Sequence, residues 1–255
     1  MENFELRNDL HTIEDYFSNS ISVKKRSFEK KSIAYIANID EPHFNVFLQR
    51  QPHRNLNQIL SDVKYFFDQH HVPRWVYVVP NDIDTSCLQE ALAQHDIVFT
   101  EKSSAMYYKF EPSLITSENS LTIEPANTNW NGFLQVMLEA FGGTKETISQ
   151  YDQALKRAAY KNTNMHHFIG ALDQQPITTI TLTFLNNWVR IDNVSTIPSH
   201  QQLGYATQIM QFGMRLAQEK GAKHAVLDAS SKGLKLYKRL GFHEIFTYHV
   251  YKHET

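Results

Sequence analysis

Residues 194–207 of the chain, VSTIPSHQQLGYAT, decide the fold, because a strand pattern changes here into a helix pattern across a short turn. The β-branched strand ends at Pro198, and Gly204 opens an amphipathic helix. This helix carries small and apolar residues along one side: Ala206, Ile209, Met210, Gly213, Leu216 and Ala217. The first turn of a helix has unpaired N–H groups and the positive end of the helix dipole, which suits a phosphate group.

Two interpretations of Gly204 and Ala206 stay open at this point. In the first, Gly204 lets a pyrophosphate approach the backbone closely, and Ala206 adds almost no bulk. In the second, both residues only permit tight packing of the helix on a sheet. The spacing excludes a P-loop, since no Gly-Lys-Ser/Thr follows, and a dinucleotide-binding fingerprint, which needs three small positions at other intervals.

A second stretch, residues 227–242 (LDASSKGLKLYKRLGF), favours the phosphate interpretation. Together the two stretches resemble the GNAT superfamily of acyl-CoA-dependent N-acyltransferases. The first matches the family's Q/R-x-x-G-x-G/A signature through Gln201, Gly204 and Ala206. The second matches a later family motif through these residues: Ser230, Leu236, Tyr237, Leu240, Gly241 and Phe242. The order of strands and helices from Leu121 onward is also the family's order, so the resemblance covers about 135 residues.

The resemblance implies a binding site for acetyl-CoA as the cosubstrate. The strand backbone at Val194, Ser195 and Thr196 would contact the pantetheine arm. The pyrophosphate would bind mainly to N–H groups of the following residues: Gln202, Leu203, Gly204, Tyr205, Ala206 and Thr207. Ser230 stands where many relatives have Asn near the pantetheine, so its contact is left open.

Tyr237 matches the tyrosine that commonly protonates the departing CoA thiolate in the family. Leu236 and Leu240 share a helix face, and Tyr237 lies about 100° round from Leu236, so its hydroxyl can reach a cleft edge while its ring packs. A tyrosine with its ordinary pKa of about 10 is protonated at neutral pH and can act as an acid. The alternative is a packing tyrosine whose hydroxyl lies in water.

Asp192 is the candidate general base. It lies two residues before Val194 and therefore shares that face of the strand. A direct or water-relayed role in deprotonating the amine is one interpretation, and a hydrogen-bonded or solvated aspartate at the strand end is the other. Relatives differ in how they supply this base, so the resemblance does not decide between them.

Strands that alternate with helices predict an α/β (α+β) fold, and the resemblance implies mixed, mostly antiparallel sheets flanked by helices. The expected helices are residues 8–18, 55–69, 86–94, 130–141, 144–160, 205–219 and 234–240. The expected strands are residues 31–38, 43–49, 74–79, 104–110, 121–124, 165–172, 176–184, 188–196, 224–227 and 244–251. The polar stretch 111–120 indicates a linker between an N-terminal domain, residues 1–115, and a catalytic domain, residues 120–255.

The N-terminal domain is interpreted as a degenerate GNAT-like copy of the second. At an offset of 143 positions four identities fall together: Phe99 on Phe242, Glu101 on Glu244, Tyr108 on Tyr251, and Lys109 on Lys252. The signature is missing there, since no glycine lies between the strand 43–49 and the helix at Asn55, and Gln94 stands in the place of Tyr237. This half is expected to bind no CoA productively, and to cover the catalytic cleft or shape the acceptor site.

Composition excludes several other classes of protein. The chain has 255 residues and a formal net charge of −2, which rules out a strongly basic nucleic-acid binder. No apolar stretch approaches the roughly 20 residues needed to span a bilayer, and residues 1–10 do not resemble a signal peptide. The only cysteine, Cys87, allows no intrachain disulfide. We therefore expect a cytoplasmic protein that acts without membrane or nucleic acid, as a monomer or homodimer.

Neighbouring histidines suggest a metal site at first sight. His70-His71 and His166-His167 are adjacent pairs, and adjacent residues on a strand point to opposite faces, so neither pair chelates easily. No His-Glu-x-x-His or paired-cysteine spacing exists, and no metal is expected. A basic run has two interpretations, a solvated face or an attraction for the 3′-phosphate of CoA: Lys232, Lys235, Lys238 and Arg239.

The sequence therefore predicts an acyl-CoA-dependent N-acyltransferase, which would transfer an acetyl group to a primary amine by direct attack in a ternary complex. The acceptor would be a small-molecule or peptide amine. Two alternatives stay open: a CoA-binding regulatory or interaction protein without turnover, and an α/β module that binds no CoA.

Overall fold

The computed structural model describes residues 2–29, 32–83, 88–111, 120–161 and 163–253. Cys87 and most of the expected linker lie outside the described residues. We call residues 2–111 the first half and residues 120–253 the second half. No helix in these described ranges has the length and apolar character that crossing a membrane requires.

The secondary structure follows the expected alternation of strands and helices. The helices are α1 (Glu2–Ile21), α2 (Leu56–Gln69), α3 (Leu88–Gln94), α4 (Trp130–Phe141), α5 (Lys145–Tyr160), α6 (Tyr205–Glu219) and α7 (Leu234–Arg239). The strands are β1 (Lys24–Ser27), β2 (Ile33–Ile36), β3 (Asn45–Leu48), β4 (Val76–Pro80), β5 (Ile97–Lys109), β6 (Thr122–Pro125), β7 (Met165–Leu172), β8 (Gln175–Leu185), β9 (Trp188–Thr196), β10 (His224–Ser230) and β11 (His243–His253). Short 3-10 turns lie at Pro42–Phe44, Ala126–Thr128 and Pro198–His200.

Local sequence signals explain where several helices begin and end. The side chain of Asn55 accepts a hydrogen bond from the N–H of Gln58 at 3.1 Å, and so caps the start of α2. Thr144 caps α5 in the same way through the N–H of Thr147, also at 3.1 Å. Gly142 ends α4 with a left-handed φ of 71°. The helices expected at 55–69, 130–141 and 144–160 are therefore confirmed within one residue.

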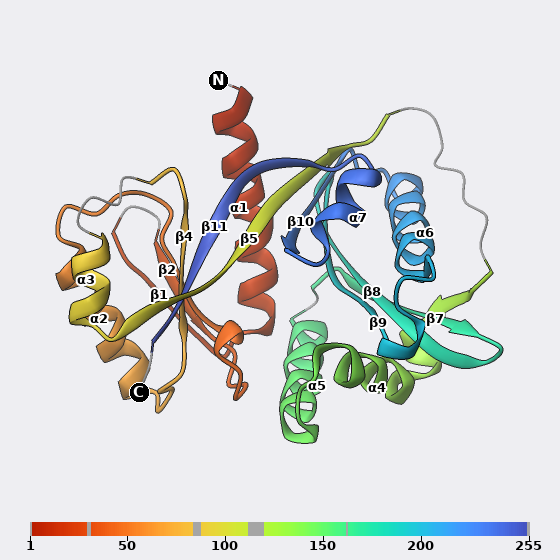
Figure 1. Ribbon diagram of the computed structural model, residues 1–255, viewed down its shortest axis with the longest axis horizontal. Coiled ribbons are helices and arrows are strands. Elements are labelled where there is room, and N and C mark those ends of the chain that lie inside the picture. Colours follow the sequence, from red (N-terminus) through yellow and green to blue (C-terminus); the bar gives the residue numbers. More distant parts are fainter. Residues whose placement is uncertain (1, 30–31, 84–87, 112–119, 162, 254–255) are drawn as a thin grey trace.

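The strands form one continuous sheet of eleven strands, in the order β1-β2-β3-β4-β11-β5-β10-β9-β8-β7-β6. Only β3–β4 and β9–β10 pair in parallel, and the other neighbours are antiparallel. The mixed, mostly antiparallel α/β fold is thus confirmed. Figure 1 shows the sheet passing through both halves, with β5 and β11 crossing each other at its centre.

The two halves exchange their last strands. The order β4–α3–β5 in the first half recurs as β10–α7–β11 in the second. However, β5 lies between β11 and β10, whereas β11 lies between β4 and β5. Strand β5 pairs with β10 from Lys109↔His224 to Ser103↔Ser230, and β11 pairs with β4 from Lys252↔Val76 to Tyr248↔Pro80. The expected domains 1–115 and 120–255 are therefore not separate sheets, because each contributes a strand to the centre of the other.

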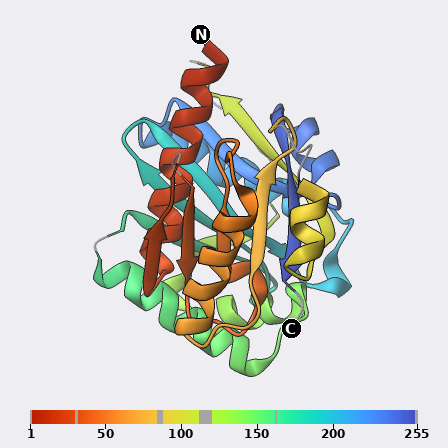
Figure 2. The ribbon, with the colours of Figure 1, turned by 90° about the vertical axis from the view of Figure 1, so that its left-hand side faces the viewer.

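Helices cover both faces of the sheet. Alternating side chains on β4 show the two layers, since Tyr77 and Val79 pack with α2 and α3 while Val76 and Val78 face α1. In the second half α6 and α7 cover the face that carries Val189 and Ile191. Figures 1 and 2 place α1 on the other face, where it runs between the halves, and α4 and α5 lie beside its C-terminal end.

Three elements differ from expectation. Helix α1 spans twenty residues, where residues 8–18 were expected. Strand β1, of sequence KKRS, was not expected, because its four polar side chains are all exposed and show no alternation. Strand β5 begins at Ile97 instead of residue 104, since its exposed polar stretch is held as a strand by pairing with β11.

Candidate functional site

The site begins where β9 and β10 stop pairing in the middle of the sheet. These parallel strands share three register pairs: Trp188↔His224, Val189↔Ala225 and Arg190↔Val226. Beyond Arg190, β9 continues to Thr196 without β10 as a partner, while β10 continues to Ser230 along β5. The facing edges of the two strands are therefore free of each other over their C-terminal parts, which leaves strand backbone available to an extended ligand.

A β-bulge on β9 turns the backbone at this point. The register with β8 shifts between Thr179↔Ser195 and Thr181↔Asp192, and Asn193 has a φ of 53°. Asn tolerates this left-handed conformation better than most residues. Its amide donates to the Tyr151 hydroxyl at 2.8 Å and to Thr181 Oγ1 at 2.9 Å, which holds the bulge in place. The bulge places Ser195 opposite Thr179, as Asp192 lies opposite Thr181, while Val194 packs with the cluster of Val189 and Ile191. The expectation that Asp192 and Val194 share a face is therefore wrong.

The loop between β9 and α6 presents unpaired amides. Among the described residues, the N–H groups of positions 202–206 donate to no backbone carbonyl, whereas those of Thr207 and Gln208 donate to the carbonyl of Gly204 at 3.0 and 3.1 Å. Gln202 and Gly204 both have positive φ, 63° and 89°. The Gln201 side chain donates to the carbonyl of Thr196 at 3.0 Å and ties the loop to the end of β9.

The geometry at Gly204 bears on the packing interpretation of this residue. A Cβ added there would meet no atom within 4 Å, so close packing of helix on sheet is not what requires glycine. The requirement is the left-handed φ, which directs the neighbouring amides away from the helix. A group of free N–H donors at a helix start is a suitable site for an anion.

Tyr237 lies on α7 with only 8% of its surface exposed. Its ring makes an edge contact with Phe242, with ring centroids 6.1 Å apart. Gly233 makes room for this ring, because a Cβ there would lie 2.8 Å from Tyr237 Cε2. Burial, assisted by the negative charge of Asp192, raises the pKa of Tyr237 to about 12. The hydroxyl is therefore protonated at neutral pH.

Asp192 belongs to a buried group of charges, which we call the inner cluster: Arg190, Asp192 and Asp228. Arg190 Nη2 lies 3.0 Å from Asp192 Oδ1 and 2.8 Å from Asp228 Oδ2. Burial raises the pKa of Asp192, Arg190 opposes this rise, and Asp228 adds to it. The Arg190 partner was not expected, although its period-two spacing from Asp192 places both side chains on one face of β9.

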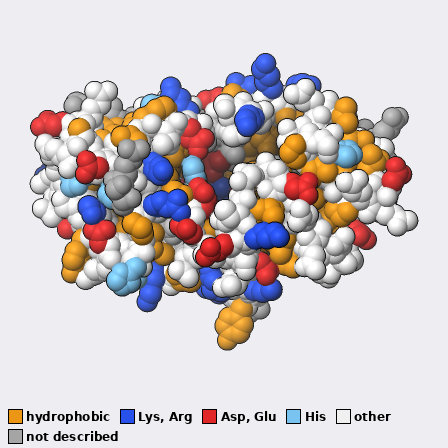
Figure 3. Space-filling model, turned by 60° about the horizontal axis from the view of Figure 1, so that its bottom comes forward, with side chains coloured by type: hydrophobic (Ala, Val, Ile, Leu, Met, Phe, Trp, Pro, Cys, Tyr) orange, Lys and Arg blue, Asp and Glu red, His pale blue; other side chains and the backbone are white. Residues whose placement is uncertain are grey.

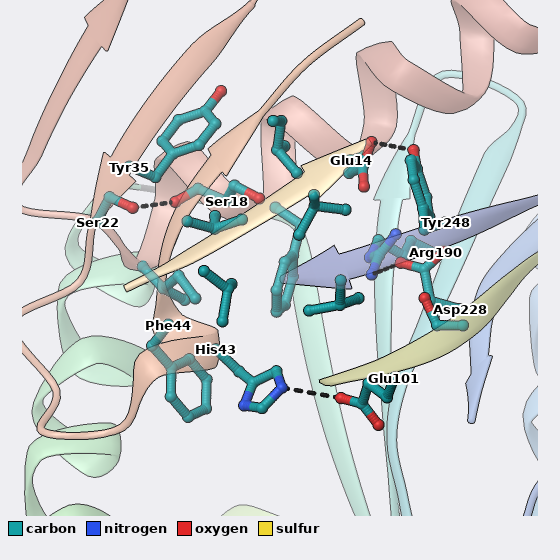
Figure 4. A pocket seen from close by; sticks show the side chains of 18 residues that line it. Glu14, Ser18, Ser22, Tyr35, His43, Phe44, Glu101, Arg190, Asp228 and Tyr248 are labelled. Atoms are coloured by element: carbon teal, nitrogen blue, oxygen red, sulfur yellow. Dashed lines mark hydrogen bonds and ion pairs between the residues drawn. The ribbon is translucent and has the colours of Figure 1, made fainter. Parts of the chain in front are cut away.

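A cavity of about 300 Å³ opens on that same face, opposite α6 (Figure 4). Most of its lining comes from the first half, and Arg190, Asp228, Tyr248 and Val250 complete it from the second. No local sequence pattern predicts this cavity, because Glu14 on α1 and Asp228 on β10 are remote along the chain. Figure 3 shows a hollow between the halves with acidic, basic and His side chains around it.

Two glutamates on opposite sides of the cavity are held differently. Glu14 is paired with Arg50 at 2.7 Å and accepts a hydrogen bond from the Tyr248 hydroxyl at 3.1 Å. Glu101 lies 2.8 Å from Nε2 of His43, whose Nδ1 lies 3.1 Å from Glu41. We call Glu41, His43 and Glu101 the rim cluster, since each side chain is about half exposed.

The other predicted residues lie where the chain order places them. Ser230 ends β10, and its carbonyl accepts the N–H of Gly233 at 3.0 Å at the start of α7. His70 and His71 lie in the turn after α2, between the expected helix and strand, whereas His166 and His167 lie in β7. Within the described part of the chain, no three or more His, Cys, Asp or Glu residues are grouped to hold a metal ion.

Known proteins share both the sequence pattern and the fold. Residues 130–242 match the model of the acetyltransferase (GNAT) family. A GCN5-related N-acetyltransferase from Kribbella flavida is 12% identical, with a TM-score of 0.70 over 96% of this chain and 95% of that one. A tandem GNAT protein from the clavulanic acid biosynthesis pathway is 8% identical, with a TM-score of 0.60 over 87% of this chain and 77% of that one. No curated protein matches the sequence.

Residues 130–242 therefore match the GNAT family, and the whole chain is similar in fold to the GNAT proteins named above. The family match lies in the second half, which carries the free amides and Tyr237, and the fold of the whole chain is that of the tandem form.

Proposed function

We propose that the protein transfers an acetyl group from acetyl-CoA to a primary amine by direct attack. The observation that carries this proposal is the alignment of one path through the second half. The free amides of residues 202–206 follow the unpaired edge of β9, and the buried Tyr237 belongs to the same core cluster as Val189 and Ile191 of β9. Acetyl-CoA supplies the activated thioester, and its anionic and extended parts fit these donors.

Each part of this path has a task in the reaction. The loop amides bind the pyrophosphate, and the β9 backbone at Val194, Ser195 and Thr196 aligns the pantetheine arm and stabilises the oxyanion. The amine nitrogen forms a bond to the acyl carbon, and the bond from that carbon to sulfur breaks. Tyr237 gives its proton to the sulfur as the thiol leaves.

The amine must also lose a proton, and Asp192 is the proposed acceptor, directly or through water. Burial supports this role because it raises the pKa of Asp192 and makes the carboxylate more basic than usual. Arg190 works against it by stabilising the ionised form. Asp192 therefore depends on the inner cluster for its basicity.

The experiment is acetyl transfer by Tyr237→Phe, with release of free thiol measured over a panel of amines. We expect kcat to fall by about 10²–10⁴-fold, as for removal of a general acid, while acetyl-CoA still raises the melting temperature. Tyr160→Phe is the matched control, since Tyr160 is 89% exposed. An unchanged kcat and pH profile would remove Tyr237 from the acid role. Stabilisation by acetyl-CoA without thiol release for any amine would favour a CoA-binding regulatory protein instead.

A further inference from the structure

The cavity on the face opposite α6 is placed to receive the acceptor. Arg190 and Asp228 line it, and they belong to the strands β9 and β10 whose edges separate just beyond Arg190. An acyl group that follows this edge from the α6 side is therefore presented to the cavity. Its volume of about 300 Å³ holds on the order of ten non-hydrogen atoms. The acceptor is thus small and is enclosed largely by the first half.

Negative charge exceeds positive charge at two separate places along this cavity. In the inner cluster, one guanidinium faces two carboxylates. In the rim cluster, His43 lies between Glu41 and Glu101, so two carboxylates face at most one positive charge. Glu14 shares Arg50 with Asp15 and also accepts a hydrogen bond from the Tyr248 hydroxyl, so it already has two partners. Charges that are partly removed from water attract a counter-charge more strongly than exposed ones.

The lining of the cavity is largely apolar, although Ser18, Ser22 and Ser103 also contribute to it. Side chains of the first half form most of it: Phe17, Ile21, Phe44, Val46, Leu48, Val76 and Val78. Figure 4 shows His43 and Glu101 facing each other on one side of the cavity, with Asp228 and Arg190 on another. Apolar lining residues suit the methylene groups of a ligand.

We propose that the acceptor is a short aliphatic diamine or polyamine whose reacting nitrogen lies at the inner cluster and whose distal ammonium binds Glu101. This inference rests on the proposed acetyl transfer and names its substrate class. Glu101 is chosen over Glu14 because only one partner, His43, is bonded to it. The inner cluster binds the reacting nitrogen as an ammonium, and Asp192 then takes one proton from it.

The reaction itself then favours release of the product. Asp192 takes one proton of the ammonium, and the amine then forms the C–N bond as the C–S bond breaks. The thiolate takes the proton of Tyr237, and the second proton lost by the nitrogen returns to the Tyr237 oxygen. The acetylated nitrogen carries no charge, so the product has one positive charge fewer than the substrate. Its attraction to the inner cluster is correspondingly weaker.

The test compares three amines of equal length with saturating acetyl-CoA: 1,4-diaminobutane, butylamine and 4-aminobutanoate. Each has four carbons, and the group at the end of a shared aminopropyl segment is an aminomethyl, methyl or carboxylate group. We expect kcat/KM for the diamine to exceed that for butylamine by about ten-fold or more, as for a hydrogen bond to a charged group. The carboxylate-bearing amine should be the poorest substrate. Equal use of the three amines, or a preference for butylamine, would overturn the inference while leaving acetyl transfer in place.

The variant Glu101→Gln tests the position of the distal ammonium. It should lower kcat/KM for the diamine more than for butylamine, so that the ratio between them falls several-fold. Glu90→Gln, an exposed change on α3, is the matched control and should leave the ratio unchanged. A ratio that is the same in Glu101→Gln and wild type would refute the contact.

Calorimetric measurement of amine binding with CoA present distinguishes a failure of this inference from a failure of the proposed function. Binding of the diamine but not of butylamine supports the acidic cavity even where no thiol is released, and in that case acetyl transfer alone fails. Absence of binding by the diamine, together with turnover of other amines, refutes the inference alone.

Discussion

Replacing Arg190 by Met is the sharpest perturbation of the inner cluster, because it leaves Asp192 and Asp228 without their common partner. The side chains of Arg190, Asp192 and Asp228 are 9%, 14% and 25% exposed, so these ion pairs lie much closer to the buried than to the surface limit. Breaking a buried pair from one side costs about 3–5 kcal/mol, whereas exposed pairs contribute about 0–1 kcal/mol. We expect a loss of about 3 kcal/mol, since Asp228 retains some contact with water.

The loss should be visible as a shift in melting temperature. For a chain of this size about 1 kcal/mol corresponds to about 2–4 °C, so Arg190→Met should melt about 6–12 °C below wild type at neutral pH. Arg54→Met, at an exposed position, is the control and should melt with the wild type. Combining Arg190→Met with Asp192→Asn should recover part of the loss, because it removes one of the two unpaired charges.

The stability deficit of Arg190→Met should depend on pH. Burial raises the folded-state pKa of Asp192 above its ordinary value, and Arg190 limits this rise. Without Arg190 the pKa rises further, so on acidification the folded variant takes up a proton before the unfolded chain does. Stability then increases as the pH falls, and the deficit should be smaller at about pH 5 than at about pH 8. A variant as stable as wild type, or a deficit that is equal at both pH values, would refute this account of the cluster.

Three further predictions concern other parts of the site. Gly204→Ala should cost about 1–2 kcal/mol through its positive φ and weaken acetyl-CoA binding, as measured by urea unfolding and calorimetry; unchanged affinity would contradict the role of the loop amides. Deleting residues 1–115 removes β5 from between β10 and β11, so residues 116–255 should lose cooperative unfolding by circular dichroism; an intact and fully active fragment would contradict the role of the first half. Because the pKa of Tyr237 is raised to about 12, acetyl transfer should show no alkaline loss from this acid below about pH 10; a loss that Tyr237→Phe abolishes at lower pH would contradict this.

Periodicity predicted the elements that bury one face. Helix α4 was predicted to the residue, and α6 and β9 likewise, since their apolar side chains recur at the helical or strand period. Strand β1 and the start of β5 were missed because their side chains are exposed and their strand conformation depends on partners remote in sequence. The sharing of one sheet was missed for the same reason, as pairing between β4 and β11 leaves no local pattern.

The residues of the site also divide into those that the sequence predicted and those that it did not. The loop at Gly204 and the residue Tyr237 stand in short contiguous motifs, and the sequence was sufficient to select them. The partners that set their chemistry were not visible. Arg190 contacts Asp228 from another strand, and Glu14 and Glu101 reach the cavity from the first half. Only the fold brings these charges together.

The exchange of β5 and β11 also has a consequence for synthesis on the ribosome. The first half cannot complete its sheet when its own residues have been translated, since β4 must wait for residues 248–252 to occupy its open edge. Until then β4, with its apolar side chains, is an edge strand exposed to wrong pairing. We therefore expect the nascent chain to depend on chaperones more than a protein whose halves mature one after the other.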